Sequence, residues 1–149
     1  MCLLVLEVLL LLKYLCFNNL YESEKVSALL TAPMLARWSQ TMMVFNAEYG
    51  RENGMAKAFV GHLRAGSLVV ASVLAIGLSV FVVVRTDVHS TASAALVLSL
   101  LCGVVALTFI GKKYFNSRLG GVTGDTIGAV SELNEVLVLL LFVVFSSGN

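Results

Sequence analysis

Apolar residues gather into five long runs that are separated by shorter polar segments. A helix needs about 20 mostly apolar residues to cross a bilayer, and each run approaches that length. The runs cover Met1 to Leu20, Leu29 to Ala47, Gly66 to Val84, Ala92 to Gly111 and Ala129 to Ser147. The pattern predicts an all-α fold, a polytopic membrane bundle of about five transmembrane helices that forms one domain over residues 1–149.

The five runs differ in the charges they carry. The third and fourth hold none, the fifth holds Glu132 and Glu135, the first holds Glu7 and Lys13, and the second holds Arg37. A charge near the centre of a spanning helix costs roughly 2.5 to 3.5 kcal/mol on insertion scales. The second run is therefore the weakest span. We expect it either to cross the membrane with Arg37 facing the bundle interior or to lie at the surface as an amphipathic helix.

Composition excludes several classes of protein. Hydrophobic residues make up 58% of the chain and charged residues 13%, against about 25% charged in a soluble domain. The net charge is +1 and no long basic run occurs, so a nucleic-acid partner is not expected. Cys2, Cys16 and Cys102 lie in apolar runs without metal-binding spacing, which indicates buried hydrophobic side chains. The first run lacks a basic leader and a small-residue cleavage site, so we expect a helix of the mature chain.

The polar segments predict an orientation in the membrane. Segments 48–65 and 112–128 together carry six basic residues, whereas segments 21–28 and 85–91 carry two. Basic residues concentrate in cytoplasmic loops of membrane proteins. We therefore expect segments 48–65 and 112–128 in the cytoplasm, with the N-terminus inside and the C-terminus outside.

The stretch from Arg118 to Glu135 holds the strongest chemical signal. Its glycines, which let a backbone turn sharply and approach a ligand, are Gly120, Gly121, Gly124 and Gly128. Thr123 or Asp125 is a candidate cap for the fifth helix, whose first N–H groups favour phosphate. Asp125 also offers a hard oxygen ligand for Mg²⁺. These features are typical of a phosphoryl-transfer site.

A structural interpretation of the same stretch stays open. Gly120, Gly124 and Gly128 are four residues apart, which is the small-xxx-small spacing of closely packed membrane helices. In that interpretation Asp125 is a helix cap and nothing more.

Two carboxylates of the fifth helix have a similar pair of interpretations. On a regular helix Asp125 and Glu132 lie about 20° apart, Glu135 lies about 60° from Glu132, and Asp125 and Glu132 are separated by roughly 10 Å of rise. Intramembrane carboxylates usually serve function, but pairing of Glu132 or Glu135 with Arg37 is the structural alternative. Arg51 is either a phosphate ligand or a determinant of orientation.

Three blocks resemble cobalamin synthase, the adenosylcobinamide-GDP ribazoletransferase of bacteria and archaea. Residues 119–130, Leu-Gly-Gly-Val-Thr-Gly-Asp-Thr-Ile-Gly-Ala-Val, are similar to the family's Gly-Gly-x-Thr-Gly-Asp-x-x-Gly-Ala signature, and a glutamate-bearing helix follows them. Pro33 with Ala36-Arg37-Trp38 is the second block. Tyr49-Gly-Arg51-Glu52, with Gly54 and Phe59, is the third and is similar to the family's Tyr-Ala-Arg-x-x-Gly stretch.

The resemblance implies a transferase of a bacterial or archaeal cytoplasmic membrane, acting late in cobalamin (vitamin B12) biosynthesis. It joins α-ribazole to adenosylcobinamide-GDP, releases GMP and uses Mg²⁺. The implied roles are Mg²⁺ or diphosphate binding for Asp125, and orientation of the site or general base for Glu132 and Glu135. Substrate binding is implied for Arg37, Arg51, Gly121, Thr123, Gly124 and Thr126.

One departure from the family changes this expectation. The family's aspartate-rich Asp-Gly-x-x-Asp-x-x-Asp-Gly motif does not occur in this sequence. The chain is therefore expected to correspond to the C-terminal part of a cobalamin synthase and to be inactive alone if those aspartates hold Mg²⁺. A missing N-terminal half or a second copy is then the expected partner. The alternatives are a small transporter or channel subunit and a non-catalytic fragment.

Overall fold

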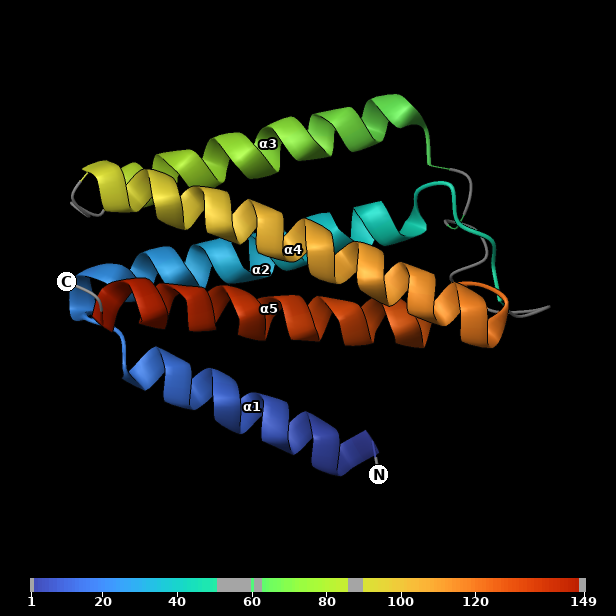
Figure 1. The fold of residues 1–149 in the computed structure, drawn as a ribbon, viewed down its shortest axis with the longest axis horizontal. Helices are drawn as coiled ribbons and strands as arrows, with labels where there is room; N and C mark the ends of the chain where they lie inside the picture. The colour runs from blue at the N-terminus through green and yellow to red at the C-terminus, as the bar shows by residue number, and fades with distance from the viewer. Residues whose placement is uncertain (1, 51–59, 61–62, 86–89, 148–149) are drawn as a thin grey trace.

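The protein is a bundle of long helices (Figure 1). The computed structural model describes residues 2–50, 60, 63–85 and 90–147. In chain order, the described helices are α1 (Cys2–Asn18), α2 (Glu22–Val44), α3 (Ala65–Val84), α4 (Ser90–Leu119) and α5 (Gly124–Ser147). The described residues contain no strand, and one isolated bridge pairs Tyr49 with Val122. The all-α prediction is confirmed.

Helix α2 is enclosed by other helices along one face. It packs along α5 and also contacts α3 and α4. Its buried face consists mainly of small or polar residues together with Leu35, Trp38 and Met43, namely Ser27, Ala28, Thr31, Ala32, Ala36 and Ser39. Small side chains let helix backbones approach closely inside a membrane. The second run is therefore less apolar than the others because other helices, rather than lipid, surround much of it.

Three of the described helices are long and apolar enough to cross a membrane: Ala65–Val84, Ser93–Leu119 and Gly124–Ser146. Helix α1 has 17 residues and α2 is more polar, so neither meets the same criterion. Large apolar side chains of α3, such as Val69, Val73 and Phe81, are exposed on the protein surface. A surface of this kind suits lipid contact, and the chain is a membrane protein.

Two predicted polar loops are largely helical, which corrects their predicted extents. Helix α2 begins at Glu22 within predicted loop 21–28, and α4 continues to Leu119 within predicted loop 112–128. Charged residues end a hydrophobic run but do not end a helix, since lysine and arginine are good helix formers. Helix α4 ends instead at Gly120, which has a positive φ of 68°.

The order of the helices places the described basic residues Arg64, Lys112, Lys113 and Arg118 toward one end of the bundle. The C-terminal ends of α2 and α4 and the N-terminal ends of α3 and α5 lie together in Figure 1. We call this end, where residues 45–50 meet residues 119–124, the glycine-turn end. Its assignment to the cytoplasm stays a prediction.

The close packing of α2 predicts the effect of enlarging Ala28, which is fully buried in the main core. Ala28→Leu should destabilise the protein by about 1 to 3 kcal/mol, because the added carbons force neighbouring helices apart. The measurement is thermal unfolding in detergent.

Val26→Leu is the matched control, because Val26 on the same helix is 64% exposed. Equal unfolding temperatures for the two variants would contradict the enclosed position of α2.

Candidate functional site

The turn between α4 and α5 is built from two adjacent glycines. Gly120 adopts a positive φ of 68°, and its N–H donates to the carbonyl of Asn116 over 3.1 Å. This bond closes the C-terminus of α4 in the manner of a left-handed helix cap. The chain then reaches α5 through residues 121–123, so the Gly-rich stretch forms a short turn rather than a long loop.

Gly121 brings this turn against the segment that follows α2. The Val122 N–H donates to the Glu48 carbonyl over 2.8 Å, and the Gly50 N–H donates to the Val122 carbonyl over 3.1 Å. A Cβ at position 121 would lie 2.5 Å from the Gly50 nitrogen and 2.6 Å from the Glu48 oxygen. The glycines were predicted to let the backbone approach a ligand closely. At Gly121 the backbone instead approaches residues 48–50 of the same chain.

Two further contacts fix the glycine-turn end. The buried side chain of Val122 packs in a small cluster with Met43, Ala47, Val60 and Val130. On the neighbouring helix, the Lys112 ammonium group donates to the carbonyls of Met42 and Phe45 at the C-terminus of α2. A cation at that position also interacts favourably with the helix dipole. The sequence marked Lys112 only as a determinant of orientation.

The alternative role for Gly120, Gly124 and Gly128 in helix packing is not what the structure shows. Gly120 lies outside the helices, and a Cβ at Gly128 would meet no atom within 4 Å. The α4–α5 contact uses Gly111 instead, where a Cβ would lie 2.7 Å from Cγ2 of Val130. Spacing alone did not identify Gly111, because its contact depends on which faces of α4 and α5 meet.

Two threonines cap the N-terminus of α5. The Thr123 N–H donates to Oγ1 of Thr126 over 2.9 Å, and the Thr126 N–H donates to Oγ1 of Thr123 over 3.4 Å. The Thr126 hydroxyl also donates to the Thr123 carbonyl over 2.9 Å. This is a reciprocal capping box, and both side chains are buried. Of the two predicted cap candidates, Thr123 takes this position, and Asp125 is exposed in the first turn.

Arg37 and the start of α5 share a pocket of about 380 Å³. Its lining residues are Arg37, Gln40, Thr41, Val44, Leu63, Gly124 and Ile127. Arg37 is exposed rather than turned into the bundle, which corrects one expectation, and its Nη1 donates to Oε1 of Gln40 over 3.2 Å. Arg37 is exposed because it lies on the outer side of α2. It is about 10 Å of rise before the C-terminal end of that helix.

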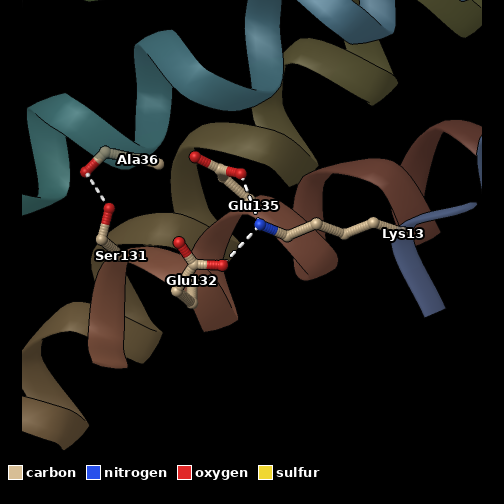
Figure 2. Close-up of polar contacts among 5 residues, drawn as sticks. All are labelled: Lys13, Ala36, Ser131, Glu132 and Glu135. Atoms are coloured by element: carbon tan, nitrogen blue, oxygen red, sulfur yellow. Dashed lines mark hydrogen bonds and ion pairs between the residues drawn. The ribbon is translucent and has the colours of Figure 1, made fainter. Parts of the chain in front are cut away.

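Other predicted site residues lie apart from this pocket or outside the described residues. Arg51 lies outside the described residues. Glu132 and Glu135 lie two to three turns further along α5, where both contact the Lys13 ammonium group of α1 (Figure 2). Oε2 of each glutamate lies 2.6 Å from Lys13 Nζ.

The prediction that Glu132 or Glu135 pairs with Arg37 is therefore wrong. Lys13 takes that position because α1 packs on α5. Helix α2 is tied to α5 at a different residue, since the Ser131 hydroxyl points to the Ala36 carbonyl over 3.4 Å (Figure 2).

A tight backbone contact at Gly121 predicts opposite effects for two glycine substitutions. Gly121→Ala should lower the unfolding temperature, because the new Cβ collides with backbone atoms of residues 48–50. Gly128→Ala should leave it unchanged or raise it, since the space is open and alanine favours a helix by up to about 1 kcal/mol. Differential scanning fluorimetry in detergent measures both, and a stable Gly121→Ala protein would refute the contact.

Together, the apolar helices and the pocket at their glycine-turn end define a polytopic helical membrane protein with a candidate anion site. The chain belongs to the cobalamin-5-phosphate synthase family, whose model matches residues 1–143.

Curated relatives carry the name adenosylcobinamide-GDP ribazoletransferase. The protein of Geotalea daltonii is 35% identical over 134 residues, which cover 90% of this chain and 50% of the relative. That of Thermoanaerobacter pseudethanolicus is 33% identical, covering 89% and 50%. That of Pseudomonas fluorescens is 35% identical, covering 91% and 51%. The chain thus spans about half the length of these relatives. No solved structure matches it.

Proposed function

We propose that this chain forms part of an adenosylcobinamide-GDP ribazoletransferase and contributes the pocket that holds the substrate's diphosphate. In this reaction a hydroxyl of α-ribazole attacks the phosphorus that is bonded to the cobinamide arm. A new phosphate–oxygen bond forms, the bond to GMP breaks, and the hydroxyl proton leaves. The observation that carries the proposal is the meeting of Arg37 and Gly124 in one pocket at the glycine-turn end.

Chemistry in this pocket suits an anionic phosphate group. The guanidinium group of Arg37 offers paired donors that match phosphate oxygens. Gly124 is the first residue of α5, where the N–H groups and the helix dipole favour a negative charge. Because Thr123 and Thr126 bond to each other, we assign them the task of holding this helix start in place. Gly121 then positions the same turn against residues 48–50.

The arrangement suits a Mg²⁺ ion that is held partly by the protein and partly by the substrate. Asp125 supplies an exposed carboxylate beside Gly124, and Mg²⁺ is commonly bound by one or two carboxylates together with substrate phosphates. The described residues contain no group of three or more His, Cys, Asp or Glu side chains that could form a site of their own. When bound, the ion would neutralise charge on the diphosphate. The other half of a full-length family member is the proposed source of further ligands.

Glu132 and Glu135 stay candidates for orienting the site or acting as a base. Their contact with Lys13 supports an orienting role, because each already has a cationic partner at 2.6 Å. Along α5, Glu132 lies about 7.5 Å of rise beyond Ile127, the last α5 residue that lines the pocket beside Arg37. A direct role in proton transfer at the pocket therefore has less support.

We propose that the glycine-turn end faces the cytoplasm of a bacterial or archaeal cell. Lys112, Lys113 and Arg118 at the end of α4, with Arg64 before α3, lie at this end, whereas Lys25 and Arg85 lie at the opposite ends of their helices. An excess of basic residues marks the cytoplasmic side. Substrates that are made in the cytoplasm would then reach the pocket directly.

Arg37 gives the first test of the proposal. Arg37→Ala should weaken adenosylcobinamide-GDP binding by about 10- to 100-fold, because a hydrogen bond to a charged group is worth about 1.5 to 3 kcal/mol. Arg37→Lys should fall between, since it keeps the charge and loses the paired donors. Binding is measured on the purified chain, alone and co-expressed with the remaining half of the Geotalea daltonii relative.

Arg85→Ala is the matched control, because Arg85 follows α3 at the other end of the bundle and lies over the Phe81 ring at 5.1 Å. If Arg37→Ala leaves adenosylcobinamide-GDP binding unchanged, the pocket beside Arg37 does not hold the diphosphate.

Asp125 gives the second test. Asp125→Asn keeps the shape of the side chain and removes its charge, so GMP release should need at least tenfold more Mg²⁺ or cease. The Mg²⁺ dependence of GMP release is compared for wild type and variant in the co-expressed complex. Normal turnover at the same Mg²⁺ concentration would sink the assignment of Asp125.

A further inference from the structure

One ammonium group joins α1 to two successive turns of α5. Lys13 Nζ lies 2.6 Å from Oε2 of Glu132 and 2.6 Å from Oε2 of Glu135. The lysine side chain is 16% exposed, and the glutamates are 37% and 23% exposed. Both carboxylates point toward the lysine in Figure 2. The cluster is thus a partly buried interhelical contact.

Helix α1 has few other means of fixing its position. It packs mainly on α5, while many of its large apolar side chains, such as Leu4, Leu11 and Leu15, are exposed. Lipid tails are as apolar as leucine, so these side chains gain little by leaving lipid for protein. Within the described part of the chain, no second ion pair connects α1 with another helix.

We propose that Lys13, Glu132 and Glu135 form an electrostatic latch that docks α1 on α5. In this assignment Lys13 is a positioning residue, and the two carboxylates are engaged in holding α1. The latch is independent of the proposed transferase activity, because its evidence is the ion-pair geometry and the packing of α1 on α5. The three charges sum to −1, so the arrangement depends on the ammonium group staying between the carboxylates.

The sign of each charge predicts how the latch fails and how it is restored. Removing Lys13 leaves two carboxylates without a cation in a partly buried position, which is more costly than losing a fully exposed pair. Reversing all three signs keeps attraction between the helices. The variant Lys13→Glu with Glu132→Lys and Glu135→Lys therefore tests the latch separately from any chemical need for carboxylates on α5.

Cys16 reports the docking of α1. It lies one turn after Lys13 and is 7% exposed in the main hydrophobic core. Release of α1 would uncover its thiol. In a background with Cys2→Ala and Cys102→Ala, the alkylation rate of Cys16 by N-ethylmaleimide in detergent measures the fraction of α1 that has left the bundle.

Lys13→Met should raise the alkylation rate of Cys16 at least tenfold, and Lys13→Glu should raise it further. The sign-reversed triple variant should return the rate to within about threefold of the parent protein. Lys113→Met is the matched control, because Lys113 is exposed near the C-terminus of α4, at the end of the bundle away from the α1–α2 connection, and its loss should not change the rate.

Two outcomes would overturn the latch. One is a Lys13→Met protein whose Cys16 is as protected as in the parent. The other is a folded triple variant whose Cys16 reacts as fast as in Lys13→Glu. If Lys13→Met and Lys13→Glu fail to fold while the triple variant folds with Cys16 protected, the latch is supported by that rescue.

Discussion

Close packing of α2 along α5 is the contact around which the other helices are arranged. The buried face of α2 is rich in alanine, serine and threonine, and the Ser131 hydroxyl of α5 reaches the Ala36 carbonyl of α2. Dispersion contacts and short polar contacts replace the hydrophobic effect as the source of helix association in lipid. Helices α3 and α4 add to the enclosure of α2, which allows it to carry polar residues at membrane depth.

Backbone contacts at the glycine-turn end follow from this arrangement. Helices α2 and α4 finish near one another, so the segments that follow them meet and exchange hydrogen bonds at Glu48, Gly50 and Val122. Gly121 has no room for a side chain there. The turn places the capped start of α5 beside Arg37 and so forms the pocket to which we assign the diphosphate. Backbone contacts on one side and a cationic side chain on the other suit the binding of a negatively charged group at this end of the bundle.

Arg37 and the two glutamates of α5 have different surroundings. Arg37 lies on the exposed side of α2 and has an amide oxygen as its hydrogen-bond partner. Glu132 and Glu135 have Lys13 between them. Uncompensated charge is costly in a medium of low dielectric constant, so the second group is best explained as a contact between helices. This difference supports the proposal that assigns the diphosphate to the pocket at the glycine-turn end and assigns Glu132 and Glu135 to the docking of α1.

The sequence by itself determined the class of fold, the number of helices and the family. These follow from local properties, since runs of apolar residues suit lipid and the Gly-Gly-x-Thr-Gly-Asp block is contiguous. It also named Thr123 as one of two candidate caps of α5, because capping depends on residues three positions apart. Tertiary structure decided the rest. Whether Gly121 faces a ligand or residues 48–50, whether Gly111 or Gly128 packs against another helix, and whether Glu132 meets Arg37 or Lys13 depend on which helix faces touch. Those choices join residues up to 122 positions apart, and no local pattern encodes them.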